Sequence, residues 1–238
     1  MKKLLTLLVL TGTLFAQANN IFTLNPSVNS AGMGNVGIAN AEVKNVFHNP
    51  AFAGLRESHQ EVSYVEWLPN LTDDMGYQSI LYTSDLGWSS EIFYFNYGTQ
   101  VQSDQYGVVL GDFESSSYRI SGGYGFGFND WLVGARLNLY SHNFIDDYSI
   151  DMNYGFDIGA YKEFGNTSLG LVLKDVGGET EFLSQKLNLP MSVGVGVGHK
   201  FGNFTLASDV KFYEDYNSIG LGGQYDLGIA SLKLGYYT

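Results

Sequence analysis

Residues 30–40 read SAGMGNVGIAN, and residues 46–51 continue as VFHNPA. Neither piece alternates apolar and polar residues with the period of a strand or of an amphipathic helix. The glycines Gly32, Gly34 and Gly37 permit positive φ angles and close backbone approach, and the Asn-Pro pair favours extended or turn geometry. Because strand patterns fill the rest of the chain, this stretch is predicted to pack inside, or at the mouth of, the sheet that follows.

The same three glycines match the pattern G-x-G-x-x-G of dinucleotide-binding folds. That site requires a buried strand before the glycines, a helix after them and an acidic residue about 20 positions later. Residues 25–29, NPSVN, are not a buried strand, and strand pairs rather than a βαβ unit follow. The sequence therefore does not predict a nucleotide site.

The chain begins like an exported protein. Two lysines precede an apolar run over residues 4–15, and residues 16–18 read AQA, an A-x-A cleavage pattern. These features predict a secretory signal peptide over residues 1–18 that is cleaved near Ala18. The apolar run is too short to span a bilayer as a helix.

Composition narrows the class further. The 238 residues carry a net charge of −12, and without the two signal-peptide lysines ten basic and 24 acidic residues remain, a net charge of −14. So acidic a protein lacks the basic patches that a nucleic-acid partner requires. No cysteine is present, so disulfides cannot stabilise the exported chain. The 30 glycines and 15% aromatic residues favour an outer-membrane β-barrel, with a soluble periplasmic β-sandwich as the alternative.

Alternation with period two recurs in runs of about ten residues, the length that a tilted strand needs to cross a membrane. In residues 131–140 and 191–201, apolar residues alternate with glycine and polar residues. Glycine on a solvent face weakens a soluble strand, whereas in a barrel lumen it leaves room for a plug or a passage. The predicted strands are 61–67, 77–84, 88–97, 116–125, 131–141, 153–164, 168–175, 191–201, 204–213, 218–225 and 230–237.

The small face of these strands also carries single charged residues of both signs. In a barrel they would point into the lumen, where opposite charges can pair as structural contacts. The charges expected to face the lumen are Arg136, Asp157, Lys174, Lys200, Asp209, Lys211 and Lys233.

Connections between the predicted strands fall into two groups. Short ones occur at residues 127–130, 164–166, 202–203 and 226–228, and longer ones at 98–115, 143–151 and 176–189. Short turns on one side and long loops on the other are typical of the periplasmic and extracellular sides of an outer-membrane barrel. The long loops are therefore predicted to be extracellular.

Eleven strands are predicted, whereas a single-chain bacterial barrel has an even number. The strand pattern runs to residues 236–238 without a turn. We expect either that one strand is miscounted or that residues 56–238 form a barrel that lacks its last strands.

Residues 30–39, together with residues 49–51 (NPA), resemble the N-terminal signature of the PorV/PorQ family, which is related to the FadL long-chain fatty-acid channels. Residues 61–71, EVSYVEWLPNL, with Asp74, are similar to the first-strand region of PorV-type members, and residues 189–190 before a valine strand also fit. The resemblance covers the chain from the opening stretch to its end. The NPA signature is shared widely with fatty-acid channels, so it indicates the superfamily, and the tryptophan segment is more specific.

The resemblance implies a fourteen-stranded transmembrane antiparallel β-barrel, of which about eleven strands are present, with a small N-terminal hatch over residues 19–55. The signature residues of that hatch are Gly32, Gly34, Gly37, Asn49, Pro50 and Ala51. PorV-type members serve the type IX secretion system, where they accept secreted cargo proteins with C-terminal signal domains and shuttle them to the attachment machinery. FadL-type members pass hydrophobic small molecules inward.

Enzymatic chemistry is not indicated by the sequence. The histidines lie in different elements without metal-ligand spacing, at His48, His59, His142 and His199. No nucleophile motif such as G-x-S-x-G appears. We predict no catalytic residue, no metal and no other cofactor.

Three functions from different classes are therefore considered. The first is a PorV-like cargo shuttle in the outer membrane, whose partners are membrane lipid, secreted cargo proteins and type IX secretion or attachment components. The alternative is a FadL-like channel for hydrophobic small molecules, and the second alternative is a soluble periplasmic β-sandwich that binds a ligand. Type IX components and cargo in the source genome separate the first two, and membrane fractionation separates the third.

Overall fold

The computed structural model describes residues 18–68, 74–104, 106–145, 148–177, 179–182 and 185–238. Three short helices precede the sheet: the 3-10 helices η1 (Ala18–Thr23) and η2 (Pro50–Leu55), with α2 (Val28–Ala31) between them. The strands are β1 (His59–Glu66), β2 (Gly76–Thr83), β3 (Trp88–Ser103), β4 (Val109–Phe128), β5 (Trp131–Ile145), β6 (Tyr148–Phe164), β7 (Thr167–Gly177), β8 (Glu179–Phe182), β9 (Gln185–Asn188), β10 (Ser192–Phe201), β11 (Phe204–Tyr213), β12 (Asn217–Asp226) and β13 (Ser231–Tyr237).

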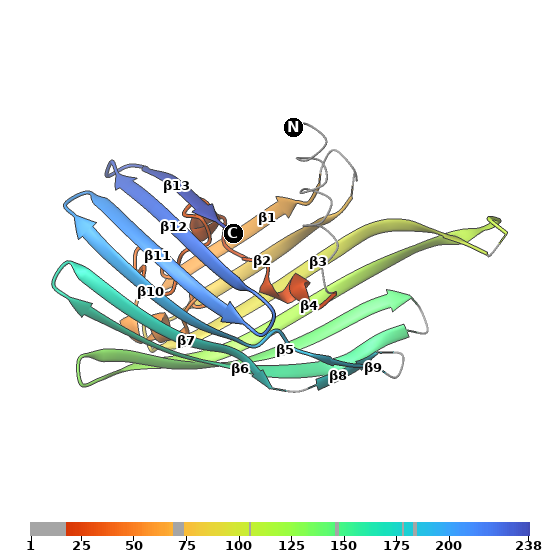
Figure 1. The fold of residues 1–238 in the computed structure, drawn as a ribbon, viewed down its shortest axis with the longest axis horizontal. Coiled ribbons are helices and arrows are strands. Elements are labelled where there is room, and N and C mark those ends of the chain that lie inside the picture. The colour runs from red at the N-terminus through yellow and green to blue at the C-terminus, as the bar shows by residue number, and fades with distance from the viewer. Residues whose placement is uncertain (1–17, 69–73, 105, 146–147, 178, 183–184) are drawn as a thin grey trace.

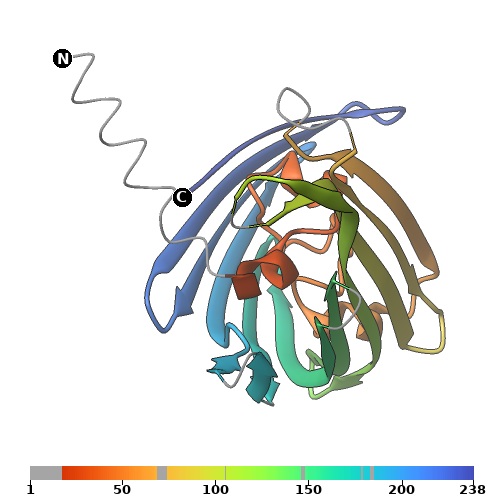
Figure 2. The same cartoon turned by 90° about the vertical axis from the view of Figure 1, so that its right-hand side faces the viewer.

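Eleven of these strands form one antiparallel sheet in the order β1-β2-β3-β4-β5-β6-β7-β10-β11-β12-β13. They correspond to the eleven strands predicted from the period-two pattern, which is thereby confirmed. The sheet curves into a trough (Figures 1 and 2), whereas β8 and β9 pair only with each other. A β-sandwich would need a second large sheet facing the first, and the described residues form none.

Side chains alternate between the two faces of the trough. On β10, Val193 and Val195 are exposed on the convex face, while Gly194 and Gly196 are buried on the concave face. The other long strands alternate in the same way, with large apolar residues on the convex face. The concave face is mostly small or polar, but β2 and β3 also turn Leu81, Phe93 and Phe95 inward. This is the reverse of the arrangement in a soluble sheet, whose apolar face is covered by other elements.

The short connections lie where the sequence predicts them, at one end of the sheet. Between β4 and β5, Asn129 and Asp130 have φ angles of 45° and 65°, the left-handed geometry that a two-residue hairpin turn requires. Gly165 and Gly202 occupy the corresponding turns with φ of 63° and 60°.

The long connections predicted at the other end are largely β-strand rather than loop in the described residues. β3 and β4 continue through most of residues 98–115 as a two-stranded ribbon, β5 and β6 continue into residues 143–151, and residues 176–189 contain the β8–β9 hairpin. Two-stranded ribbons of this kind are held together by hydrogen bonds between their strands. Because neither face is buried, their sequence does not alternate between apolar and polar residues.

Closure of the sheet into a barrel stays a prediction. Within the described residues, β1 pairs only with β2, and β13 pairs only with β12. In the same part of the chain, no helix is long and apolar enough to cross a membrane. The predicted signal peptide, apart from Ala18, and residues 69–71 of the family-like segment lie outside the described residues.

Candidate functional site

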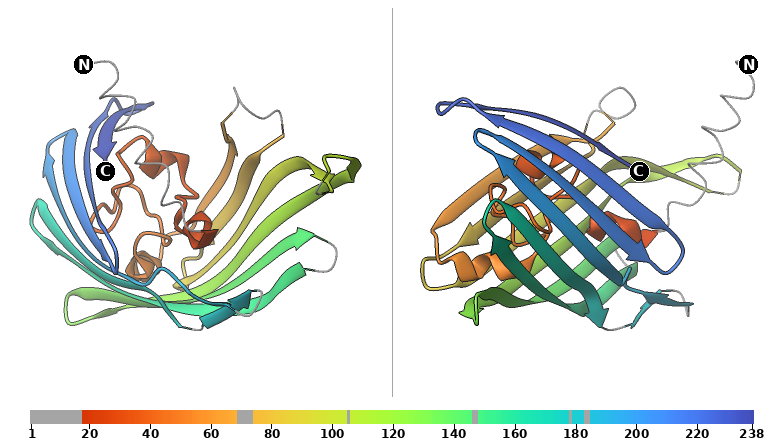
Figure 3. Two further views of the ribbon diagram at one scale, coloured as in Figure 1. Left: turned by 45° about the vertical axis from the view of Figure 1, so that its right-hand side comes forward. Right: turned by 60° about the vertical axis from the view of Figure 1, so that its left-hand side comes forward.

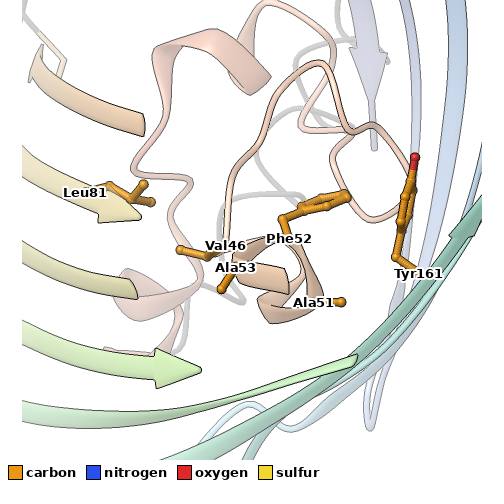
Figure 4. Close-up of a cluster of buried hydrophobic side chains, with 6 residues drawn as sticks. All are labelled: Val46, Ala51, Phe52, Ala53, Leu81 and Tyr161. Atoms are coloured by element: carbon orange, nitrogen blue, oxygen red, sulfur yellow. The ribbon is translucent and has the colours of Figure 1, made fainter. Parts of the chain in front are cut away.

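Residues 21–57, which we call the inner segment, lie in the trough against the concave face (Figure 3). They comprise most of the predicted hatch over residues 19–55. Their apolar anchor joins β2 to β6 across the trough and consists of Val46, Ala51, Phe52 and Ala53 of the segment with Leu81 of β2 and Tyr161 of β6 (Figure 4). The Phe52 and Tyr161 rings meet edge to face with centroids 5.0 Å apart, so the contact adds aromatic attraction to the burial of apolar surface.

Residues Asn49, Pro50 and Ala51, which we call the clamp, attach the inner segment to the concave face of the sheet. Asn49 has extended geometry, with φ −149° and ψ 110°, and caps η2 by accepting a hydrogen bond from the N–H of Ala51. Its side-chain amide donates to the carbonyl oxygens of Ile38 at 2.8 Å and of Ala160 on β6 at 3.1 Å. Pro50 follows at the first helical position, where its missing N–H costs no hydrogen bond.

Two of the three signature glycines are required by the fold. Gly34 has φ +69°, and a Cβ there would lie 2.5 Å from the backbone nitrogen of Tyr236 on β13. A Cβ at Gly37 would lie 2.5 Å from the His48 ring. Of the three, only Gly34 uses the positive φ that glycine permits. Gly32 has φ −61°, and its Cβ would meet nothing closer than 3.5 Å.

Glycines on the concave face of the sheet allow the inner segment to pack directly against the strand backbones. On β10 and β12, a Cβ at Gly194, Gly196, Gly220 or Gly222 would collide with residues 33–39. Side chains at these positions would therefore force the segment away from the wall. Gly155 differs, because a Cβ there would meet Leu189 and Tyr140 instead.

Asp209 and Lys211 of β11 bind the backbone of the glycine-rich stretch. Oδ2 of Asp209 accepts hydrogen bonds from the N–H groups of Gly37 at 2.7 Å and of Ile38 at 2.9 Å. Nζ of Lys211 donates to the carbonyl oxygen of Asn35 at 3.2 Å. Two predicted charges thus hold the inner segment rather than pairing only with other wall residues.

A second group of charges lies on neighbouring strands β3 to β6. The carboxylate of Glu91 is fully buried and contacts both Arg119 and Arg136, with Nη1 of Arg136 at 2.9 Å. Nε of Arg136 also lies 3.4 Å from Oδ2 of Asp157, its direct cross-strand neighbour. Oδ1 of Asp157 accepts from the N–H of Asp175, whose own carboxylate accepts from the Tyr140 hydroxyl.

Phe47 connects the inner segment to this charge cluster. Its ring centre lies 3.6 Å from Nζ of Lys174, 4.6 Å from Cζ of Arg119 and 5.6 Å from Cζ of Arg136. The negative face of an aromatic ring attracts cations, more strongly where water is excluded. Arg119 also donates to the carbonyl oxygen of Phe22, so the cluster contacts the segment at two places.

His48, next to Phe47, is buried with Nε2 2.8 Å from the hydroxyl of Ser30. Burial holds the pKa of His48 well below its usual value, and the positive charges of Lys211, Lys174 and Arg136 lower it further. The imidazole is therefore neutral at pH 7. The sequence assigned no role to His48, and its hydrogen bond shows that it joins residues 46–51 to the start of the glycine-rich stretch of residues 30–40.

The remaining predicted charges lie apart from these groups. Lys200 forms an exposed ion pair with Glu42, with Nζ 2.7 Å from Oε1. Lys233 of β13 is half-buried, and its side chain packs near Gly32. Neither residue joins the buried cluster.

The sequence did not predict the site residues Glu91, Arg119, Asp175 and Phe47. A usable signal was present for two of them, because Glu91 and Arg119 share the inward side of strands 88–97 and 116–125 with small or aromatic residues. Asp175 is turned inward by a register shift between β6 and β7 and has φ 56°, which alternation alone does not reveal. Phe47 lies in a segment without periodicity.

Chemically, this site is suited to holding a polypeptide segment. Most of its polar groups contact backbone atoms or each other. The described residues contain no group of three or more His, Asp or Glu side chains that could hold a metal ion. Neither the comparison with protein-family models nor the search among curated proteins returned a match for this chain.

Proposed function

We propose that this chain is a PorV-like outer-membrane β-barrel of the type IX secretion system, which binds secreted cargo with C-terminal signal domains and shuttles it to the surface attachment complex. The observation that carries the membrane assignment is the convex face of the sheet. Every strand of the sheet exposes at least one large apolar side chain there, such as Val62, Ile80, Ile92, Ile120, Leu137, Ile158, Leu171, Val195, Leu206, Leu221 and Leu234. Soluble monomers rarely expose apolar patches larger than a few hundred Å², whereas a lipid bilayer covers such a face.

Aromatic residues support a defined membrane thickness. On β4, the outward side chains run from Phe128, beside a short turn, to Tyr118, whose ring packs at a tilt against Tyr94 of β3. Ten residues along a strand span about 33 Å, and a tilt of roughly 40° reduces the height to about 25 Å. That is the height of the apolar band between the aromatic girdles of outer-membrane barrels.

The inner segment fits the role of a hatch in this proposal. It is tied to β6 by Asn49 and to β11 by Asp209, and it packs on β12 and β13 through the stretch around Gly34. In a closed barrel such a segment would obstruct the lumen. The short turns would then face the periplasm and the extended hairpins the cell exterior.

The concave face favours a protein shuttle over a channel for hydrophobic molecules. Its buried lining includes Glu91, Arg119, Arg136 and Asn138 together with several serines. An acyl chain passing these groups would remove charged and polar atoms from their partners without replacing the lost hydrogen bonds.

Deletion of the gene in its source organism tests the proposed function. Cargo with C-terminal signal domains should accumulate in the periplasm and disappear from the surface, while uptake of long-chain fatty acids is unchanged. Normal cargo display with impaired uptake would favour the FadL-like alternative. Release of the protein from membranes by a carbonate wash would support the soluble alternative and exclude the barrel.

A further inference from the structure

The hairpin of β3 and β4 projects well beyond the neighbouring strands (Figure 1). Among the described residues, β3 pairs with β2 only as far as Asn96, and β4 pairs with β5 only from Ser116 onward. Beyond these points the two strands pair only with each other. We call residues 97–115 the ribbon.

The ribbon exposes apolar side chains that a membrane cannot cover. Val101, Tyr106, Val108, Val109 and Leu110 are each more than half exposed. Tyr118 marks the end of the apolar band in the proposed function, and Val109 lies nine residues farther along β4, about 30 Å at 3.3 Å per residue. Exposed apolar residues outside the bilayer indicate a surface that binds protein.

The two edges of the ribbon differ. On the β3 edge, Oδ2 of Asp74 accepts a hydrogen bond from the N–H of Thr99 at 2.7 Å, so a carboxylate already occupies that backbone donor. On the β4 edge, residues 109–114 have no strand partner on the side away from β3 in the described part of the chain. An unpaired edge presents N–H and C=O groups that can bind an added strand.

The charges of the ribbon indicate which kind of added strand its free edge would bind. The ribbon carries Asp104, Asp112 and Glu114 and no lysine or arginine. Asp112 and Glu114 are exposed and lie opposite Val101 and Thr99, so no cation on the partner strand neutralises them. These carboxylates attract a basic strand and repel an anionic lipid surface.

We propose that the β4 edge of the ribbon binds an extended strand of a secreted cargo protein in which basic residues alternate with apolar residues. This inference rests on the proposed function, which places the ribbon outside the cell and supplies the cargo. The added strand would extend the ribbon by backbone hydrogen bonds. Because side chains alternate between the two faces of a strand, its apolar residues would cover the face that carries Val109, and its basic residues would lie beside Asp112 and Glu114 on the other face.

The test uses the purified full chain in detergent and three fluorescent eight-residue peptides. The first alternates lysine with valine, the second is the same peptide N-methylated at every second residue, and the third alternates glutamate with valine. The lysine peptide should bind at least about tenfold more tightly than either of the others, because N-methylation removes backbone donors along one edge and glutamate reverses the charge. Hydrogen exchange should slow at residues 109–114 when the lysine peptide is added.

A charge-reversed protein supplies the matched comparison. The double variant Asp112→Lys with Glu114→Lys should prefer the glutamate peptide. The control carries the same change at Glu214→Lys and Asp215→Lys, two exposed residues in the β11–β12 turn at the same end of the sheet, and should keep the preference of the unmodified protein. Equal binding of all three peptides, or an unchanged preference in the ribbon variant, overturns the proposal.

Two further outcomes separate this proposal from its premises. Slowed exchange at residues 109–114 in lipid nanodiscs without peptide would mean that lipid covers the ribbon, and would also overturn the proposal. Peptide binding by the purified protein does not depend on its cellular location. Failure of the fractionation and cargo-display experiments with intact peptide binding would contradict the proposed function alone. Success of those experiments without peptide binding would contradict the ribbon proposal alone.

Discussion

Asp209 and Gly37 are 172 positions apart in the chain, yet the carboxylate of Asp209 accepts a 2.7 Å hydrogen bond from the backbone N–H of Gly37. The same oxygen accepts from the next residue, Ile38. Successive backbone N–H groups that converge on one carboxylate oxygen form a strong, charge-assisted contact. The glycine-rich stretch is therefore held in place by a side chain from a distant strand.

Replacement Asp209→Asn should loosen the inner segment. The variant loses the charge that strengthens two hydrogen bonds, at a cost of about 2 kcal/mol. Protease cleavage within residues 21–57 should then accelerate by roughly thirtyfold if cleavage requires the segment to detach. The control Asp226→Asn alters a carboxylate that caps an exposed turn through Gly228 and should leave cleavage unchanged. Equal rates in the two variants would contradict the assigned role of Asp209.

Replacement Gly34→Val should disturb the inner segment more than the sheet. A β-branched residue is strained at φ +69°, and its Cβ would collide with the backbone of Tyr236. On the proposed function, the protein should remain heat-modifiable on a gel but show altered pore conductance or lost cargo binding. The matched variant Gly32→Ala should behave like the unmodified protein, because its Cβ meets nothing closer than 3.5 Å. Unchanged conductance, cargo binding and protease sensitivity in Gly34→Val would exclude the hatch.

Replacement Asn49→Asp should destabilise the clamp although it preserves size. The carboxylate can still accept from Ala51, but it no longer donates to the carbonyl oxygens of Ile38 and Ala160. Leaving these two carbonyl oxygens without their donor, next to a buried carboxylate, should lower the free energy of unfolding by about 3 kcal/mol. The temperature at which the folded form is lost on a gel should fall, whereas Asn203→Asp in an exposed turn should leave it unaltered.

Acid should weaken the docking of the inner segment through His48. Its pKa is below the usual value of 6.5 in the docked state, so the detached segment binds the proton more readily. The contribution of neutral His48 to the stability of the docked segment is therefore complete above pH 6.5 and is lost as pH falls below that value. Protease cleavage of residues 21–57 should rise between pH 7 and pH 5, and His48→Asn should reduce that rise. An identical pH dependence in the variant would assign the effect to carboxylates instead.

If the sheet forms the proposed outer-membrane barrel, single cysteines should report its orientation. The chain has no cysteine of its own, so Val108→Cys in the ribbon and Asn203→Cys in a short turn each provide one thiol. A membrane-impermeant maleimide added to intact cells should label position 108 and not position 203. The opposite pattern would invert the predicted topology.

Local chemistry explains why so much of the sheet was predictable. A strand with one apolar face must alternate with period two, so the core of each long strand could be recognised from sequence, as could the turn at Asn129 and Asp130. The ribbon beyond Asn96 and the β8–β9 hairpin escaped notice. Their strands are held by pairing with each other rather than by a buried face, and pairing between distant residues leaves no local signal.

The sequence by itself determined which residues could face inward, including Arg136, Asp157 and Asp209, because side-chain direction along a strand is a local property. Only the tertiary structure decided their partners. Arg136 meets Asp157 because of the register of β5 and β6, and Asp209 meets Gly37 because the inner segment folds back across the trough. Register and docking depend on the packing of the whole sheet, which sums many weak contacts between residues far apart in the chain.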